Sequence, residues 1–127
     1  MKHGYLLTIL LFIFSTFAYS KSWNDVSRLN PESVSQVINV QSKQDIVDTL
    51  KNLTKDTKLT ISGTRHSQGG HIVYPDGIVI DMTSFNKVID ISPQEKLIRV
   101  QSGATWQQVQ QAANQHGLAV KVMQSSN

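Results

Sequence analysis

The chain has 127 residues, with 12 Lys and Arg against 9 Asp and Glu, no Cys, and a formal net charge of +3. This mild charge, with no Lys/Arg run interleaved with aromatic residues, disfavours a nucleic-acid partner. The lack of cysteine excludes disulfides, thiolate metal sites and a cysteinyl nucleophile or flavin link in this chain. The length allows one small core, so one domain or part of one is the upper limit.

The first twenty residues are typical of a signal peptide. Lys2 and His3 supply positive charge ahead of an apolar stretch from Tyr5 to Phe17, which is shorter than the roughly 20 residues that a membrane span needs. Small residues at Ala18 and Ser20 lie where a signal peptidase recognises its substrate. We therefore expect cleavage after Ser20 and export to the periplasm or beyond, with no membrane anchor left. A retained anchor helix is the alternative.

The first part of the mature chain has the order strand, helix, strand. Residues 21–35 are polar and contain Asn30-Pro31, so we expect an irregular leader without chemistry. The alternation in 36–41 predicts a strand, and a capping pattern at Ser42 begins a helix over 43–55. A strand over 58–62 follows. The apolar stripe of the helix should pack on a sheet in a right-handed βαβ crossover; it consists of Ile46, Val47, Leu50 and Leu53.

The second part of the chain predicts mainly antiparallel strands and another helix. Three β-like runs cover 77–81, 87–91 and 97–101, and the last two are expected to form a hairpin. Thr105 with Gln108 makes a capping box, Trp106, Val109 and Ala113 share one helix face, and Gly117 ends the helix. A further strand is expected over 118–123. The chain therefore has the pattern of an α+β domain.

A polar glycine-rich loop, GTRHSQGGH at residues 63–71, follows the second predicted strand directly. Three glycines within eight positions let backbone N–H groups turn toward an anion without obstruction by Cβ atoms. Arg65 adds charge and Ser67 a hydroxyl, both useful at a diphosphate. A tight turn between strands uses the same glycines, but two histidines, an arginine and a serine are more polar chemistry than a turn needs.

Two other kinds of site in this loop are less well supported. A metal site needs a third ligand beside His66 and His71, whose separation differs from that of an HExxH helix. A hydrolytic nucleophile at Ser67 needs the GxSxG elbow, whereas its neighbours are histidine and glutamine. The sequence thus indicates neither a metal site nor catalytic side chains.

Four stretches, taken together, resemble the N-terminal portion of the PCMH-type FAD-binding domain of the vanillyl-alcohol oxidase and p-cresol methylhydroxylase flavoprotein superfamily. They occur in the order and with the spacing of that family, and the likeness covers residues 36–127. The expected fold is then the first part of this α+β domain, incomplete at its C-terminal side. The stretches are GTRHSQGGH, PDGIVIDMTSFNKV, IRVQSGATWQQV and QHGLAVKVMQSSN.

The resemblance implies FAD as cofactor and assigns positions to it. In the family the glycine loop wraps the FAD diphosphate, and a histidine matching His66 often carries the flavin covalently at its 8α carbon. Gly103-Ala104 matches a segment where the backbone passes close to the cofactor, and Gln124-Ser125 leads into a second flavin loop. His71 lies beyond the loop and is expected to be a polar residue without this role. The other matching positions are Gly63, Thr64, Arg65, Ser67, Gln68, Gly69 and Gly70.

The resemblance also implies an activity. We expect the FAD-binding portion of an exported oxidoreductase that takes a hydride from a carbon bearing oxygen or nitrogen, from a small-molecule substrate. The substrate domain, which supplies most catalytic side chains in the family, has no counterpart here, so the isolated chain is expected to be inactive. The alternative is a non-catalytic product, either a truncated remnant or a small periplasmic binding protein.

Overall fold

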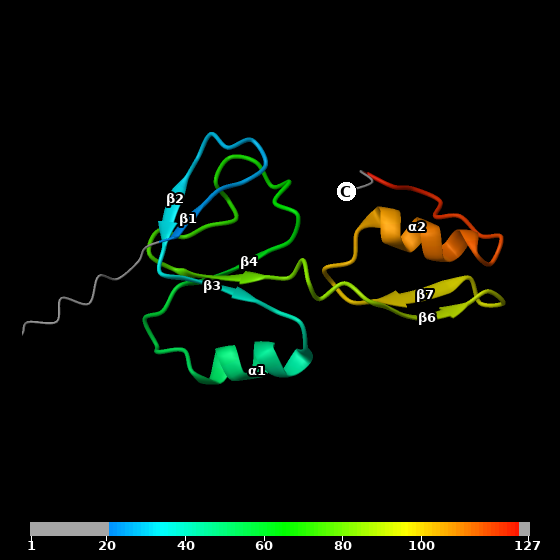
Figure 1. The fold of residues 1–127 in the computed structure, drawn as a ribbon, viewed down its shortest axis with the longest axis horizontal. Helices are drawn as coiled ribbons and strands as arrows, with labels where there is room; N and C mark the ends of the chain where they lie inside the picture. The colour runs from blue at the N-terminus through cyan, green and yellow to red at the C-terminus, as the bar shows by residue number, and fades with distance from the viewer. Residues whose placement is uncertain (1–20, 125–127) are drawn as a thin grey trace, which may run out of the picture.

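The computed structural model describes residues 21–124 of the chain. The predicted signal peptide lies outside the described residues, as does Ser125. The described elements form two groups in Figure 1: strands β1 to β5 with helix α1, and the hairpin β6–β7 with helix α2. This is the α+β arrangement that the sequence predicted.

The expected leader contains a small antiparallel hairpin. β1 (Lys21–Trp23) pairs with β2 (Glu32–Val34), so the expectation of an irregular segment is wrong for these residues. Pro31 does not prevent the pairing because it lies just before the strand, where its missing N–H is not needed. Trp23 and Val34 are buried in a core cluster, here called the hairpin cluster, that also contains Ile72 and Val79. The hairpin is therefore held by apolar burial.

Three parallel strands form the centre of the first group, in the order β3–β5–β4. They are β3 (Gln36–Asn39), β4 (Leu59–Ser62) and β5 (Ile78–Asp81). The predicted strand–helix–strand order is confirmed, but β5 lies between the two strands that α1 connects. The core lies on both faces of β5, since Val79 belongs to the hairpin cluster and Ile80 to a cluster with Val40 and Met82.

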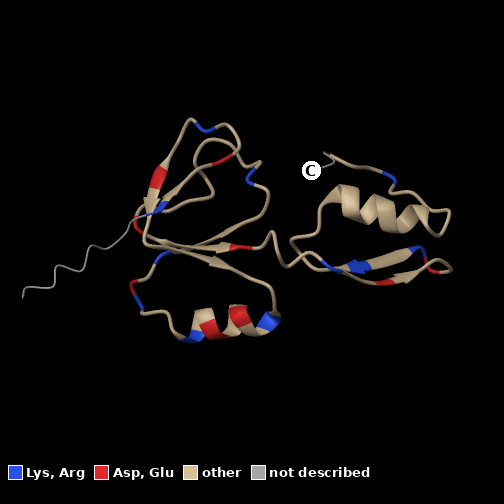
Figure 2. Ribbon diagram, in the orientation of Figure 1, with Lys and Arg blue, Asp and Glu red and all other residues tan. Residues whose placement is uncertain are grey.

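Helix α1 (Lys43–Lys51) begins at the predicted residue and ends earlier than predicted. The Ser42 hydroxyl accepts from the Asp45 N–H, and the Asp45 carboxylate accepts from the Ser42 N–H. Asn52 ends the helix because its side chain and backbone N–H both donate to the Asp48 carbonyl. Ile46 packs on the sheet, whereas Leu50 is half exposed. Charges of both signs lie along this helix in Figure 2.

The second group is a hairpin covered by one helix (Figure 1). β6 (Val88–Ser92) and β7 (Leu97–Val100) pair antiparallel with a bulge, which confirms the predicted hairpin. α2 (Trp106–Asn114) has the predicted capping box, and its inner face is formed by Val109 and Ala113. Trp106 is 41% exposed at one end of this face.

The strand expected over residues 118–123 does not form. Gly117 follows α2 at φ 67°, as a helix-ending glycine does. The chain then returns beside the helix, where Leu118 N–H donates to the Ala113 carbonyl and Val120 N–H to the Gln110 side chain. Its alternating apolar residues suit a strand, but no strand in the described part of the chain pairs with it.

Candidate functional site

The glycine loop is exposed but firmly anchored at both ends. Ser62, the last residue of β4, is 1% exposed, and its carbonyl accepts from the N–H of Met82 on the neighbouring chain segment. Ile72, just after the loop, is buried in the hairpin cluster. Between them, residues 63–69 are exposed and Gly70 is half-buried. The polar side chains of the loop are thus presented to solvent at the end of a strand.

Three residues of the loop have left-handed backbone conformations: Arg65 at φ 66°, Gly69 at 90° and Gly70 at 77°. Glycine adopts such angles without steric cost, whereas an arginine there is held by its surroundings. Two contacts hold Arg65. Its carbonyl accepts from Val26 N–H at 2.9 Å, and its guanidinium lies 4.9 Å from the centre of the Trp23 ring.

The loop borders a hollow of about 370 Å³. The chain returns to the same hollow at Gln124, so the structure brings this residue together with the loop. Within residues 21–124, no acceptor is paired with the backbone N–H groups of residues 64–68. The hollow is lined by Ile61, Gly63, Thr64, Arg65, His66, Ser67, Ile72 and Gln124.

This arrangement fits the diphosphate of FAD. Unpaired N–H groups in a glycine loop bind phosphate oxygens well, and Arg65 adds a positive charge and Ser67 a hydroxyl beside them. His66 lines the same hollow, is exposed, and has no hydrogen-bond partner among the described residues. Its imidazole is therefore open to a ligand. The polar lining and the Gln124 amide suit a polar group such as a diphosphate.

Other predicted positions lie outside this hollow. Gly69 and Gly70 belong to the loop but do not line the hollow, and their N–H groups lie toward the Asp25 carboxylate. Gln68 is exposed and does not line the hollow either. His71 lies beside Gly69, where a Cβ on that glycine would be 3.1 Å from the His71 Nε2. The predicted Ser125 lies outside the described residues.

Gly103 and Ala104 lie at the junction of the two groups of elements. The Gly103 N–H donates to the Phe85 carbonyl at 2.8 Å, and a Cβ on Gly103 would be 1.8 Å from the Met82 carbonyl oxygen. The Ala104 N–H donates to the Gln101 carbonyl. The described structure therefore gives Gly103 a packing role, and its proximity to FAD stays a prediction.

Asp25 is a site residue that the sequence reasoning missed. It is 3% exposed, and its carboxylate accepts from Gly70 N–H at 3.1 Å and from both the N–H and the hydroxyl of Ser27. The Ser27 hydroxyl is the main cause that lowers the pKa of Asp25 below its ordinary 3.8; burial opposes this, and the N–H groups of Gly70 and Gly69 support it. Asp25 is therefore an anion bound to the back of the loop.

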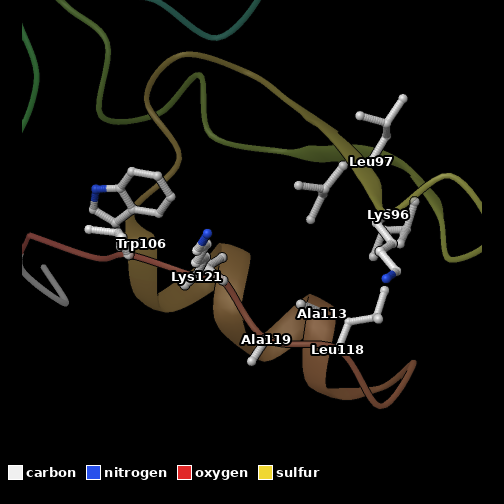
Figure 3. A pocket seen from close by; sticks show the side chains of 11 residues that line it. Lys96, Leu97, Trp106, Ala113, Leu118, Ala119 and Lys121 are labelled. Carbon is white, nitrogen blue, oxygen red and sulfur yellow. The ribbon is translucent and has the colours of Figure 1, made fainter.

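A larger, apolar groove of about 480 Å³ lies between the β6–β7 hairpin, α2 and residues 118–122 (Figure 3). Leu97, Ala113 and Leu118 line it, and Trp106 stands at one end. Apart from Lys96 and Lys121 its lining residues are apolar. The groove lacks the convergent polar groups that a diphosphate needs. The hollow at the loop is therefore the better cofactor site, although its volume is smaller.

A family model described as "FAD binding domain" matches residues 34–127. The chain belongs to this family. The match begins at the end of β2 and covers the loop, both helices and Gln124, which confirms the resemblance drawn from the four motifs. FAD is thus the ligand of the FAD binding domain described here. A search of curated proteins found no match.

Two further observations concern other kinds of site. In residues 21–124, no helix is long and apolar enough to cross a bilayer. The same residues contain no group of three or more His, Cys, Asp or Glu side chains arranged to hold a metal ion.

Proposed function

We propose that this chain is the FAD-binding part of an exported flavin-dependent oxidoreductase, which acts on a small molecule at a carbon bearing oxygen or nitrogen. The family supports the flavin, and the signal-peptide pattern of residues 1–20 supports export. Bound FAD supplies the hydride-accepting chemistry, while the chain supplies binding and orientation.

The observation that carries the proposal is the exposed loop beside the 370 Å³ hollow, whose amides at residues 64–68 have no partner within residues 21–124. In this proposal the N–H groups of residues 64–68 bind the FAD diphosphate, with the Arg65 guanidinium and the Ser67 hydroxyl beside it. Gln124 lines the same hollow and supports the site. His66 carries the flavin covalently at its 8α carbon, which its exposed and unpartnered imidazole permits.

We further propose that the 127-residue chain alone is not a competent oxidase. The described surface leaves large apolar side chains in water, including Ile61 at 66%, Leu97 at 62% and Val122 at 73% exposure. The apolar groove is open as well. Surfaces of this kind are normally covered by further protein, which favours additional structure in the active enzyme.

The test is to express the chain, supply FAD, and record the visible absorbance of the protein before and after gel filtration in denaturant. Wild-type protein should retain the flavin absorbance through denaturation, and His66→Ala should lose it in denaturant while still binding FAD when folded. His71→Ala is the matched control and should behave as wild type. Flavin released from denatured wild-type protein would reject the covalent link. No flavin binding at all would favour the non-catalytic remnant or small binding protein.

A further inference from the structure

We propose that Asp25 is the positioning residue of a clamp, formed by residues 23–30, which holds the 63–71 loop in its FAD-binding conformation. The proposal rests on the proposed function, because it concerns the same loop. The whole clamp precedes residue 34, where the family match begins. It therefore adds a structural part to the FAD site that the family match does not include.

The clamp contacts the loop at two separated points. Near the start of the loop, Val26 N–H donates to the Arg65 carbonyl at 2.9 Å. Near its end, Gly70 N–H donates to the Asp25 carboxylate at 3.1 Å. Of the unpaired amides of residues 64–68, those of 66–68 lie between these points, and those of 64 and 65 directly precede the first. Fixing both points restricts the conformations that the intervening amides can adopt, so the loop is ordered before any ligand binds.

At both contact points the clamp supports loop backbone in a left-handed conformation. Arg65, at φ 66°, is a non-glycine residue in the left-handed region, and its side chain also stacks on Trp23. Gly70 is likewise left-handed, and a Cβ there would lie 3.4 Å from the Asn30 Cβ of the clamp. The conformation persists because these contacts determine it.

The clamp is itself rigid because of local hydrogen bonds and burial. Asp25 accepts from the Ser27 N–H at 2.8 Å and from the Ser27 hydroxyl, and Arg28 N–H donates to the Asp25 carbonyl at 3.1 Å. Trp23, at its start, is buried in the core cluster with Ile72. Ile72 directly follows the loop, so one core anchors both the clamp and the loop.

Asp25 acts on FAD through the loop and not by contact. It is buried and does not line the 370 Å³ hollow. Its carboxylate occupies the Gly70 N–H, so this amide is not available to the diphosphate. Anion binding therefore falls to residues 64–68, whose N–H groups stay unpaired within the described chain.

The experiment compares the full chain with Asp25→Ala, Asp25→Asn and the control Asp56→Ala, whose carboxylate is exposed without a partner in the described structure. Hydrogen exchange of the Val26 and Gly70 amides is measured without FAD, and FAD affinity is measured by quenching of flavin fluorescence in a His66→Ala background, where no covalent link can form. Asp25→Ala should speed exchange of both amides and raise the FAD Kd roughly tenfold, because affinity falls with the fraction of molecules whose loop is competent. Asp25→Asn keeps an acceptor oxygen and should show smaller changes; Asp56→Ala should match wild type.

Unchanged exchange and affinity in Asp25→Ala would overturn the clamp. Wild-type protein that fails to bind FAD would reject the proposed function, and the exchange rates would then decide the clamp alone. If Asp25→Ala does not fold, Ser27→Ala takes its place, since it removes the hydroxyl that donates to the carboxylate. The clamp requires faster exchange of Gly70 in this variant, and wild-type exchange there would overturn it.

Discussion

Gly103 lies against the backbone of Met82 so closely that a Cβ on residue 103 would be 1.8 Å from the Met82 carbonyl oxygen. The Gly103 N–H also donates to the Phe85 carbonyl at 2.8 Å. These contacts join the segment before α2 to the segment after β5. These contacts connect the backbones of the two groups of elements.

Gly103→Ala should therefore destabilise the protein severely, by about 3 kcal/mol, because the clash is with backbone that cannot move without disturbing β5. Two glycines without close neighbours serve as controls. Gly117→Ala meets no atom within 4 Å but places alanine at φ 67°, and should cost about 1 kcal/mol. Gly63→Ala meets neither problem and should be nearly neutral. Urea unfolding of the three variants without FAD measures this order, and an equal effect at all three positions would contradict the packing.

Protonation of the Asp25 carboxylate in acid should weaken the hydrogen bond that it accepts from the Gly70 N–H. Hydrogen bonds from Ser27 and Gly70 lower the folded-state pKa of Asp25, so its contribution to stability is fully present above the ordinary value of 3.8. It is lost as the pH falls through the lower folded-state pKa. The Gly70 amide shift, followed by NMR between about pH 2 and 6, should move with a midpoint below 3.8. A midpoint at or above 3.8 would contradict the geometry.

The pKa of a second carboxylate, that of Asp45, is also lowered, so its titration must be distinguished from that of Asp25. The N–H groups of Gln41 and Ser42 lower the pKa of Asp45, which completes the capping box of α1 with Ser42. Asp45→Asn should leave the Gly70 titration unchanged and remove the acid dependence of the α1 amides. Asp25→Asn should do the reverse. Loss of both transitions in either variant would show that the loop and the helix are coupled.

The two capping boxes predict similar costs for two hydroxyl deletions. Ser42→Ala removes the acceptor for the Asp45 N–H, and Thr105→Ala removes the acceptor for the Gln108 N–H. Each should lower the free energy of unfolding by about 1 kcal/mol. Thermal unfolding followed by circular dichroism gives the comparison. Thr54→Ala removes a hydroxyl that bonds with Thr57 in an exposed turn, and should cost less.

Local patterns predicted most of the elements correctly. Ser42 and Thr105 begin their helices where the capping pattern placed them, because a cap depends on residues within one turn. The order of the sheet was not predictable in this way. β5 could pair at an edge of the sheet or lie between β3 and β4. The outcome depends on how Val79 packs on one face of β5 and Ile80 on the other, against residues that are distant in sequence.

Long-range contacts also explain what the sequence reasoning missed at the site. The loop was recognisable from its glycines, and Gln124 from the resemblance. Asp25 gave only a weak local signal, an aspartate two residues before a serine, because its main role depends on Gly70, 45 residues further on. The strand expected over 118–123 failed for the same reason, since its alternation carries no information about a partner strand.

The central claim, that the amides of residues 64–68 bind FAD, is tested most directly by NMR. Backbone amide shifts of the 15N-labelled chain are recorded as FAD is added, with ADP as a probe for the diphosphate alone. We predict that both ligands shift the amides of 64–68 and Gln124 first and leave the groove residues Leu97 and Val120 unchanged. Shifts concentrated at the groove, with the loop amides unmoved, would contradict this account.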